Sequence, residues 1–249
     1  MARQTGLIKI KGTLDNVNFY KTKDGDLARM KTSVDAARIK NDPAFVRTRE
    51  NGQEFGMAAR SGKLVRDAFR PMTMLAADGR VTSRLTKLMS DIRKLDTTSV
   101  RGERNVATAI ADPTAKEQLK GFNFNQGAIL KSILFRPFTL DVATGVLEIA
   151  DLIPANHIAA PQGSTHVAFT ASWGKVDFAG DVYEVERSNT VNLPIDTNLS
   201  TVTLTPPNTP AGTGIDFFLL LVEFFQEVNG NQYSLKDGQY NALSIVDVA

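Results

Sequence analysis

Residues that could carry out catalysis are sparse in this chain of 249 residues. The chain contains no cysteine, which excludes disulfides, thiolate metal sites and a cysteine nucleophile. Its two histidines, His157 and His166, are nine residues apart, and this spacing matches no zinc motif. The sequence also lacks a G-x-S-x-G nucleophile elbow and a phosphate-binding P-loop. We therefore expect no catalytic residue, no metal site and no cofactor.

Carboxylates are the remaining candidates for chemistry. Glu184 and Glu186 stand two residues apart on a predicted strand, so their side chains share one face, with Asp177 and Asp181 shortly before them. Such a group could bind a hard cation or supply the acid and base of a glycosidase. The same residues also fit a solvated acidic face of a sheet, and this is the interpretation that we favour.

The clearest signal is the distribution of charge along the chain. Residues 1–120 contain 24 Lys and Arg but 14 Asp and Glu, a net charge of +10, whereas residues 121–249 contain 5 and 13, a net charge of −8. This asymmetry predicts two domains, a basic one over residues 1–120 and an acidic one over residues 121–249. The basic half could bind nucleic acid or the acidic half of another copy. Alternatively, the two halves attract each other within one chain.

The charged residues that we expect at an assembly interface fall into three groups. Acidic residues such as Glu50 and Glu54 are interspersed among the helical arginines, and mixed signs favour a protein contact over a nucleic-acid contact. The basic candidates are Lys9, Lys11, Lys21 and Lys23 in strands and turns, and Arg47, Arg49, Arg60 and Arg66 in a helix. The acidic candidates are Asp177, Asp181, Glu184 and Glu186.

Strands and helices that would position these residues can be predicted for the basic half. Residues 7–14 alternate with period two, and turn signals at Asp15-Asn16 and Asp24-Gly25 predict a three-stranded meander over residues 7–31. A helix is predicted over residues 43–69, a second over 71–96 and a short one from Asp112 to about Gly121.

Three glycines lie inside the first predicted helix: Gly52, Gly56 and Gly62. Each costs about 1 kcal/mol relative to alanine in a helix interior. The helix therefore either packs closely against another backbone or is broken into two pieces at Gly52 or Gly56.

The acidic half has the pattern of an all-β domain. Short apolar runs recur at intervals of about 8–12 residues with turn signals between them, of which Asn229-Gly230 is the strongest. The most apolar run, residues 217–222, is too short to span a membrane and predicts a buried strand. The fold class that we expect is α+β, with an N-terminal hairpin or meander plus helices and a C-terminal antiparallel β-sandwich, Ig-like or jelly-roll-like. The predicted strands are 128–136, 138–143, 146–151, 165–172, 175–178, 181–187, 190–193, 200–205, 215–228, 231–235 and 242–248.

Three stretches of the basic half resemble a known group of proteins. These are residues 6–13 (GLIKIKGT), 20–25 (YKTKDG) and 41–51 (NDPAFVRTREN). They resemble an uncharacterised Bacteroidota family with a glycine-rich N-terminal hairpin and an Arg-rich helix carrying an NDPxFxRTREN motif. The resemblance covers about the first 70 residues. It implies the same hairpin and helix, and no activity comes with it.

These observations favour a non-enzymatic structural subunit that forms a homo-oligomer or filament by docking its basic half on a neighbour's acidic sandwich. Two alternatives remain: a nucleic-acid-binding module that uses the basic helices, and a sandwich that binds carbohydrate or another ligand through Tyr183, Tyr233 and Tyr240. No signal peptide and no membrane span are expected, so synthesis in the cytoplasm is predicted. An extracellular filament or particle would require a leaderless route.

Overall fold

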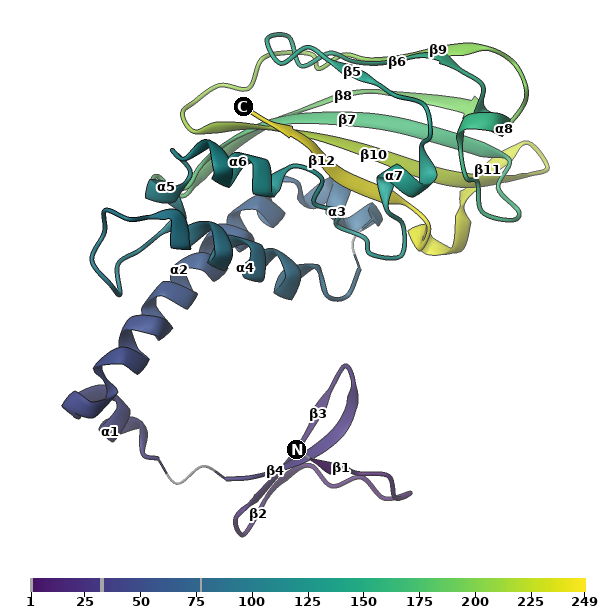
Figure 1. Ribbon diagram of the computed structural model, residues 1–249. Coiled ribbons are helices and arrows are strands. Elements are labelled where there is room, and N and C mark those ends of the chain that lie inside the picture. Colours follow the sequence, from purple (N-terminus) through teal and green to yellow (C-terminus); the bar gives the residue numbers. More distant parts are fainter. Residues whose placement is uncertain (1, 32–33, 77) are drawn as a thin grey trace. The chain divides into compact units, whose positions relative to one another are not determined.

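The computed structural model describes residues 2–31, 34–76 and 78–249. The fold is α+β, with antiparallel sheets, an N-terminal strand meander and a sandwich-like C-terminal part (Figure 1). The chain divides into two compact units, Met1–Arg49 and Glu50–Ala249, which we call the N-terminal unit and the C-terminal unit.

The N-terminal unit is built on a small antiparallel sheet. Its strands are β1 (Ala2–Arg3), β2 (Gly12–Leu14), β3 (Val17–Thr22) and β4 (Gly25–Met30), in the order β1-β4-β3-β2. The meander that we predicted is confirmed, and the turn at Asp15-Asn16 joins β2 to β3 with Asp15 at φ 50°. The strand expected over residues 7–14 is shorter than predicted, because only Gly12–Leu14 pairs. Two short helical segments follow the sheet: α1 (Ala36–Asn41) and a 3₁₀ turn, η1 (Pro43–Phe45).

Helix α2 (Val46–Ala68) is continuous, so the alternative of a break at Gly52 or Gly56 does not occur. The close backbone approach that we expected occurs at Gly62 alone of the three glycines. A Cβ at this position would lie 3.5 Å from the backbone nitrogen of Thr86. At Gly52 and Gly56 a Cβ would meet no atom within 4 Å, so close packing within the chain does not account for these two glycines.

The rest of the helical layer consists of short elements. These are α3 (Arg70–Ala76), α4 (Val81–Ile92), the 3₁₀ turn η2 (Arg93–Leu95), α5 (Val106–Ala109) and α6 (Pro113–Leu119). The single helix predicted over residues 71–96 is therefore two helices and a 3₁₀ turn; residue 77, between the helices, lies outside the described residues. The short helix predicted after Asp112 is confirmed, with the Asp112 side chain accepting a hydrogen bond from the Thr114 N–H at its start.

The larger sheet of the C-terminal unit contains five antiparallel strands. They are β7 (His166–Asp177), β8 (Val182–Pro194), β10 (Ile215–Val228), β11 (Asn231–Ser234) and β12 (Ala242–Val248). The order is β11-β10-β7-β8, and β12 also pairs with β10. A 3₁₀ turn, η3 (Leu235–Gly238), joins β11 to β12. The predicted turn at Asn229-Gly230 connects β10 to β11, and both residues have positive φ, as a hairpin turn of this kind requires.

A smaller sheet lies along one face of the larger one, and helices α3, α4 and α6 lie along the opposite face (Figure 1). The smaller sheet has the order β5 (Thr139–Leu140), β6 (Leu147–Leu152) and β9 (Ser200–Leu204). The strand predicted over residues 128–136 is wrong, because this segment contains the short helix α7 (Leu130–Ile133). A further short helix, α8 (Pro154–His157), follows β6.

Strand β10 separates two hydrophobic cores. Its side chains alternate, so that Phe217, Leu219 and Leu221 join the core that contains the helices, while Leu220, Val222 and Phe224 join the core under the smaller sheet. Residues of α2, α4 and α6 thus share one core with β10 and β12. For this reason the chain divides after Arg49, and the boundary that we predicted at residue 120 lies inside the C-terminal unit.

Candidate assembly surfaces

The N-terminal unit contains no buried side chain among its described residues. Leu7 and Ile8 are 105% and 86% exposed, and Leu14 and Met30 are 64% and 67% exposed. A small sheet normally needs a hydrophobic face packed against another element to be stable. Within the described part of this unit nothing covers these apolar side chains, so they remain unburied.

The segment before β2 has the sequence of a strand but no strand partner. It is held at one point by Gln4, whose side-chain amide accepts a hydrogen bond from the Ile10 N–H at 2.8 Å and donates one to the Ile10 carbonyl at 3.1 Å. The Lys9 ammonium donates to the Gln4 carbonyl. No backbone hydrogen bond joins Leu7, Lys9 or Lys11 to another described residue.

The other predicted basic residues of the sheet lie around the β3–β4 hairpin. Lys21 is on β3 opposite Asp26, and Lys23 lies in the turn between β3 and β4. Both are exposed, as are Lys9 and Lys11. The described N-terminal unit therefore presents the four lysines that we predicted at its surface.

The four predicted arginines of the helix do not form one free row. Arg49 donates to the carbonyls of Ile39 and Asp42, at 2.8 and 3.0 Å. Arg66 donates to the Gly62 carbonyl at 3.3 Å and to the Thr82 hydroxyl at 2.6 Å. Arg47 and Arg60 are exposed. Because two of the four are engaged in structural contacts, a continuous basic face along α2 is not formed.

Two of the four predicted acidic residues belong to the turn between β7 and β8. Asp177 accepts hydrogen bonds from the N–H groups of Gly180 and Ala179 and from the Thr213 hydroxyl, and these bonds hold the pKa of its carboxyl below the usual value. Asp181 adopts positive φ, 57°, in the same turn. The Asp177 carboxylate is thus already used within the chain.

Glu184 and Glu186 lie on β8, at the edge of the larger sheet. They share the face of the sheet that carries Lys175 and Trp173, which are their partners on β7. The Lys175 ammonium forms an ion pair with the Asp216 carboxylate at 3.0 Å. No ion pair joins either glutamate to the described chain. The two carboxylates are therefore free for a partner.

A pocket of about 470 Å³ borders the same edge on the helix-facing side. Its walls come from the junction of α2 and α3 and from β8, and include Phe69, Met72, Tyr183, Val185 and Arg187. Figure 1 shows β8 as the outer strand of the larger sheet. The β8 edge thus combines an acidic face with a partly apolar hollow on the other face.

The three tyrosines that we considered for ligand binding do not form one platform. Tyr183 is on β8 and Tyr233 on β11, which lie at opposite ends of the sheet order. Tyr240 packs against the core under the smaller sheet. A flat aromatic surface of the kind that stacks on a sugar is not built from these residues.

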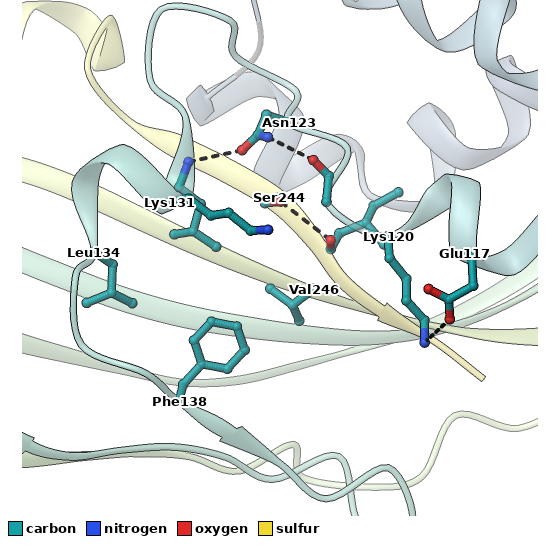
Figure 2. Close-up of a pocket in the computed structure, with 11 residues that line it drawn as sticks. Glu117, Lys120, Asn123, Lys131, Leu134, Phe138, Ser244 and Val246 are labelled. Carbon is teal, nitrogen blue, oxygen red and sulfur yellow. Dashed lines mark hydrogen bonds and ion pairs between the residues drawn. The ribbon is translucent and has the colours of Figure 1, made fainter.

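A second pocket, of about 510 Å³, lies beside β12 (Figure 2). Lys120 there pairs with Glu117 and Asp247, both at 2.8 Å, and the Asn123 amide donates to the Gly121 carbonyl and accepts from the Leu130 N–H. Lys131 lines the same pocket, is exposed and makes no ion pair with the described residues. Since most of its polar groups already have partners, this pocket offers a ligand one exposed cation.

Two buried carboxyls have shifted pKa values. Burial raises the pKa of Glu223 on β10, and the charge of Arg187 partly opposes this effect. For Asp96, burial acts to raise the pKa, but hydrogen bonds from Ser99, Asn105 and Thr98 outweigh it and hold the pKa far below its usual value. Asp96 organises the loop after η2, and we assign it a structural role.

The sequence showed only part of what makes residues 7–11 a candidate surface. Ile8 and Ile10 alternate with Lys9 and Lys11, and this alternation predicted a strand paired within the chain. The exposure of these apolar side chains and the Gln4 contact were not predictable.

In the described residues no group of three or more His, Asp or Glu could hold a metal ion, and no helix is long and apolar enough to cross a membrane. Comparison of the chain with protein-family models, curated proteins and solved structures finds no match.

Proposed function

We propose that this protein is a non-enzymatic structural subunit that assembles with copies of itself into a homo-oligomer or filament. The observation that carries the proposal is the unburied apolar surface of the N-terminal unit. Leaving several large apolar side chains in water is unfavourable, at roughly 25 cal/mol per Å² of surface that a partner would bury. Large apolar side chains that stay exposed in this number are typical of an interaction site.

The distribution of charge supports another copy of the same chain as the partner. The N-terminal unit has 11 Lys and Arg but 5 Asp and Glu, a net charge of +6, while residues 121–249 have a net charge of −8. A contact between unlike surfaces of identical subunits is heterologous, and it generates rings or open filaments. The sign of the charge thus favours docking of the N-terminal unit of one copy on the β-rich part of the next.

The experiment is light scattering on a size-exclusion column for the full chain and for a variant without residues 1–31, at about 0.05 and 0.5 M salt, concentrations that span the range over which screening changes strongly. We expect a species several times 27.1 kDa for the full chain and a monomer for the truncated one. The truncated protein should fold, because both cores consist of residues from Ala58 onward. A full chain that stays monomeric at both salts, or truncation without effect on the size, would overturn the proposal.

Binding to nucleic acid is measured in the same fractions by a gel shift with duplex DNA at low salt. The engagement of Arg49 and Arg66 within the chain argues against this alternative. A salt-dependent shift with a monomeric protein would favour it over self-assembly.

A further inference from the structure

The free edge of β8 is a ready template for another strand. Over residues 182–187 no backbone hydrogen bond joins the outer side of β8 to the described chain, because β8 is the last strand in the sheet order. Natural sheets usually protect such an edge with inward charges, bulges or a covering loop. Here it displays Val182 and Tyr183, which are 55% and 42% exposed, beside the two free glutamates.

The segment Leu7 to Lys11 has the sequence pattern of a strand but pairs with no strand, and a bend covers its first residues. In an extended chain, the N–H and carbonyl of one residue point to the same side, and those of its neighbours point to the other side. Since Gln4 occupies the backbone groups of Ile10, those of Lys9 and Lys11 would point away from Gln4 once the segment is extended. They have no backbone partner in the described chain.

From these two features, and resting on the self-assembly proposed above, we infer a specific joint between subunits. Residues 7–11 of one copy add as a strand to the β8 edge of a second copy, with Lys9 beside Glu184 and Lys11 beside Glu186. Addition of an extended segment to a sheet edge is an established mode of recognition, in which the backbone supplies affinity and the side chains supply specificity.

The two faces of the joint match residue by residue. Lysines at positions 9 and 11 share one face of the added strand, and glutamates at 184 and 186 share the corresponding face of β8. Ile8 and Ile10 then fall on the opposite face, beside Tyr183 and Val185, where the pocket of about 470 Å³ borders β8. A shift of one residue would move both lysines away from the two glutamates, to the face that carries Tyr183 and Val185, so the charge pattern favours this register.

The direction of the added strand follows from the neighbouring positions. In the parallel direction, the exposed side chain of Leu7 lies beside the exposed Val182, and Ile8 lies beside Tyr183. In the antiparallel direction, the lysines exchange partners, so that Lys9 lies beside Glu186 and Lys11 beside Glu184. Leu7 would then lie beside Ser188 and Ile8 beside Arg187. The parallel direction alone matches every apolar residue with an apolar or aromatic one, so we assign it.

Charge reversal in the full chain tests the pairing. Lys9→Glu with Lys11→Glu should weaken assembly about tenfold, since two cross-strand attractions become repulsions of a fraction of a kcal/mol each. Glu184→Lys with Glu186→Lys should do the same, and the four changes together should restore assembly. The matched control is Lys21→Glu with Lys23→Glu, which makes the same change of charge in the same unit and should have a much smaller effect.

Engineered cysteines test the register, and the absence of native cysteine makes the result unambiguous. Leu7→Cys with Val182→Cys, oxidised in the assembled state, should give a ladder of covalent multimers on a non-reducing gel, and each single variant should give dimers at most. The control pair, Thr13→Cys with Val182→Cys, would be adjacent only in the antiparallel direction and should give no ladder.

The outcomes separate this joint from the wider proposal. A full chain that never assembles would contradict both the proposed self-assembly and the proposed β8 joint. If truncation of residues 1–31 abolishes assembly while reversal at Lys9 and Lys11 has no more effect than the control, self-assembly stands and the β8 joint is wrong. A ladder from the control pair alone, or a cross-link confined to single chains, also overturns the joint.

Discussion

Phe69, the residue between α2 and α3, lies directly over Gly174 of β7. A Cβ at position 174 would approach the Phe69 Cζ to 2.7 Å and the Val185 Cγ2 to 2.9 Å, distances that real side chains do not adopt. Phe69 is also in ring contact with Phe217, at 6.2 Å between centroids. This contact sets how closely the helical layer approaches the larger sheet.

Gly174→Ala should therefore destabilise the C-terminal unit by about 1–3 kcal/mol, the usual cost of overpacking a core. Urea unfolding followed by circular dichroism measures the change. Adding Phe69→Leu to the variant should recover part of the loss, because the shorter side chain leaves room for the methyl group. If the alanine alone were neutral, the packing described here would be wrong.

Gly52→Ala should act in the opposite direction. The position is inside α2 and a Cβ there meets nothing within 4 Å, so alanine should stabilise the helix by about 1 kcal/mol. The measurement is the unfolding free energy of the monomeric protein without residues 1–31. In the full chain, the size of the assembly should not change, since the β8 joint does not involve this face; a smaller assembly would indicate that Gly52 packs against another copy.

Arg93 and Glu54 form a buried ion pair, with 12% and 7% of their side chains exposed, and Glu54 also accepts from the Gly102 N–H at 2.8 Å. Arg93→Met should cost about 3–5 kcal/mol, because it leaves a buried carboxylate without its cation. The exposed pair Lys63–Asp67 provides the control, and Lys63→Ala should change stability by less than about 1 kcal/mol. Equal losses in the two variants would refute the distinction between the pairs.

Asp96 should give stability a dependence on pH. Its pKa is lower in the folded protein than in the unfolded chain, so the folded state holds its proton less tightly. The stabilisation is present above the ordinary pKa of an aspartate, about 4, and is lost as the pH falls from there toward the lower folded value. Asp96→Asn should flatten this acidic limb of the stability profile and lower stability at pH 7, as urea titrations between about pH 2 and 7 would reveal. An unchanged profile would contradict the prediction.

Gln4→Ala should weaken assembly without altering the stability of the C-terminal unit. The substitution removes the two hydrogen bonds that hold Ile10, so residues 7–11 must be ordered at the moment of docking. The entropic cost is about 1–2 kcal/mol for each residue whose backbone is newly fixed. Analytical ultracentrifugation of the full chain measures the shift, and Gln4→Glu separates the two bonds, because it keeps an acceptor for the Ile10 N–H but removes the donor.

The sequence predicted well those elements whose pattern is local. The Asn229-Gly230 turn and the run at residues 217–222 identified the β10–β11 hairpin and the buried strand, and Asp112-Pro113 marked the start of α6. The segment at residues 128–136 was misassigned because a short apolar run fits a buried strand and a buried helical turn equally well. Charge suggested the wrong boundary, because residues 50–120 are basic on their surface yet share a core with acidic strands. The division of the chain into units follows from which residues are buried together, and the distribution of surface charge does not report this.

The candidate site could also be predicted from the sequence only in part. Alternation identified Lys9, Lys11, Glu184 and Glu186 as surface residues with a common spacing. Whether a strand is at an edge depends on which strands flank it, and this is a property of the whole sheet order rather than of any single segment. The free edge of β8 could therefore be recognised only in the structure.

Strand β10 has a consequence for how the protein melts. Because alternate residues of this one strand belong to the two cores, neither core can lose its packing while the other keeps it. The C-terminal unit should therefore absorb heat in a single cooperative transition, with equal calorimetric and van't Hoff enthalpies. The N-terminal unit buries no side chain among the residues that the structure describes, and it should add almost nothing to that peak on its own. A second endotherm that appears only in assembled samples would report directly on the unit's docking.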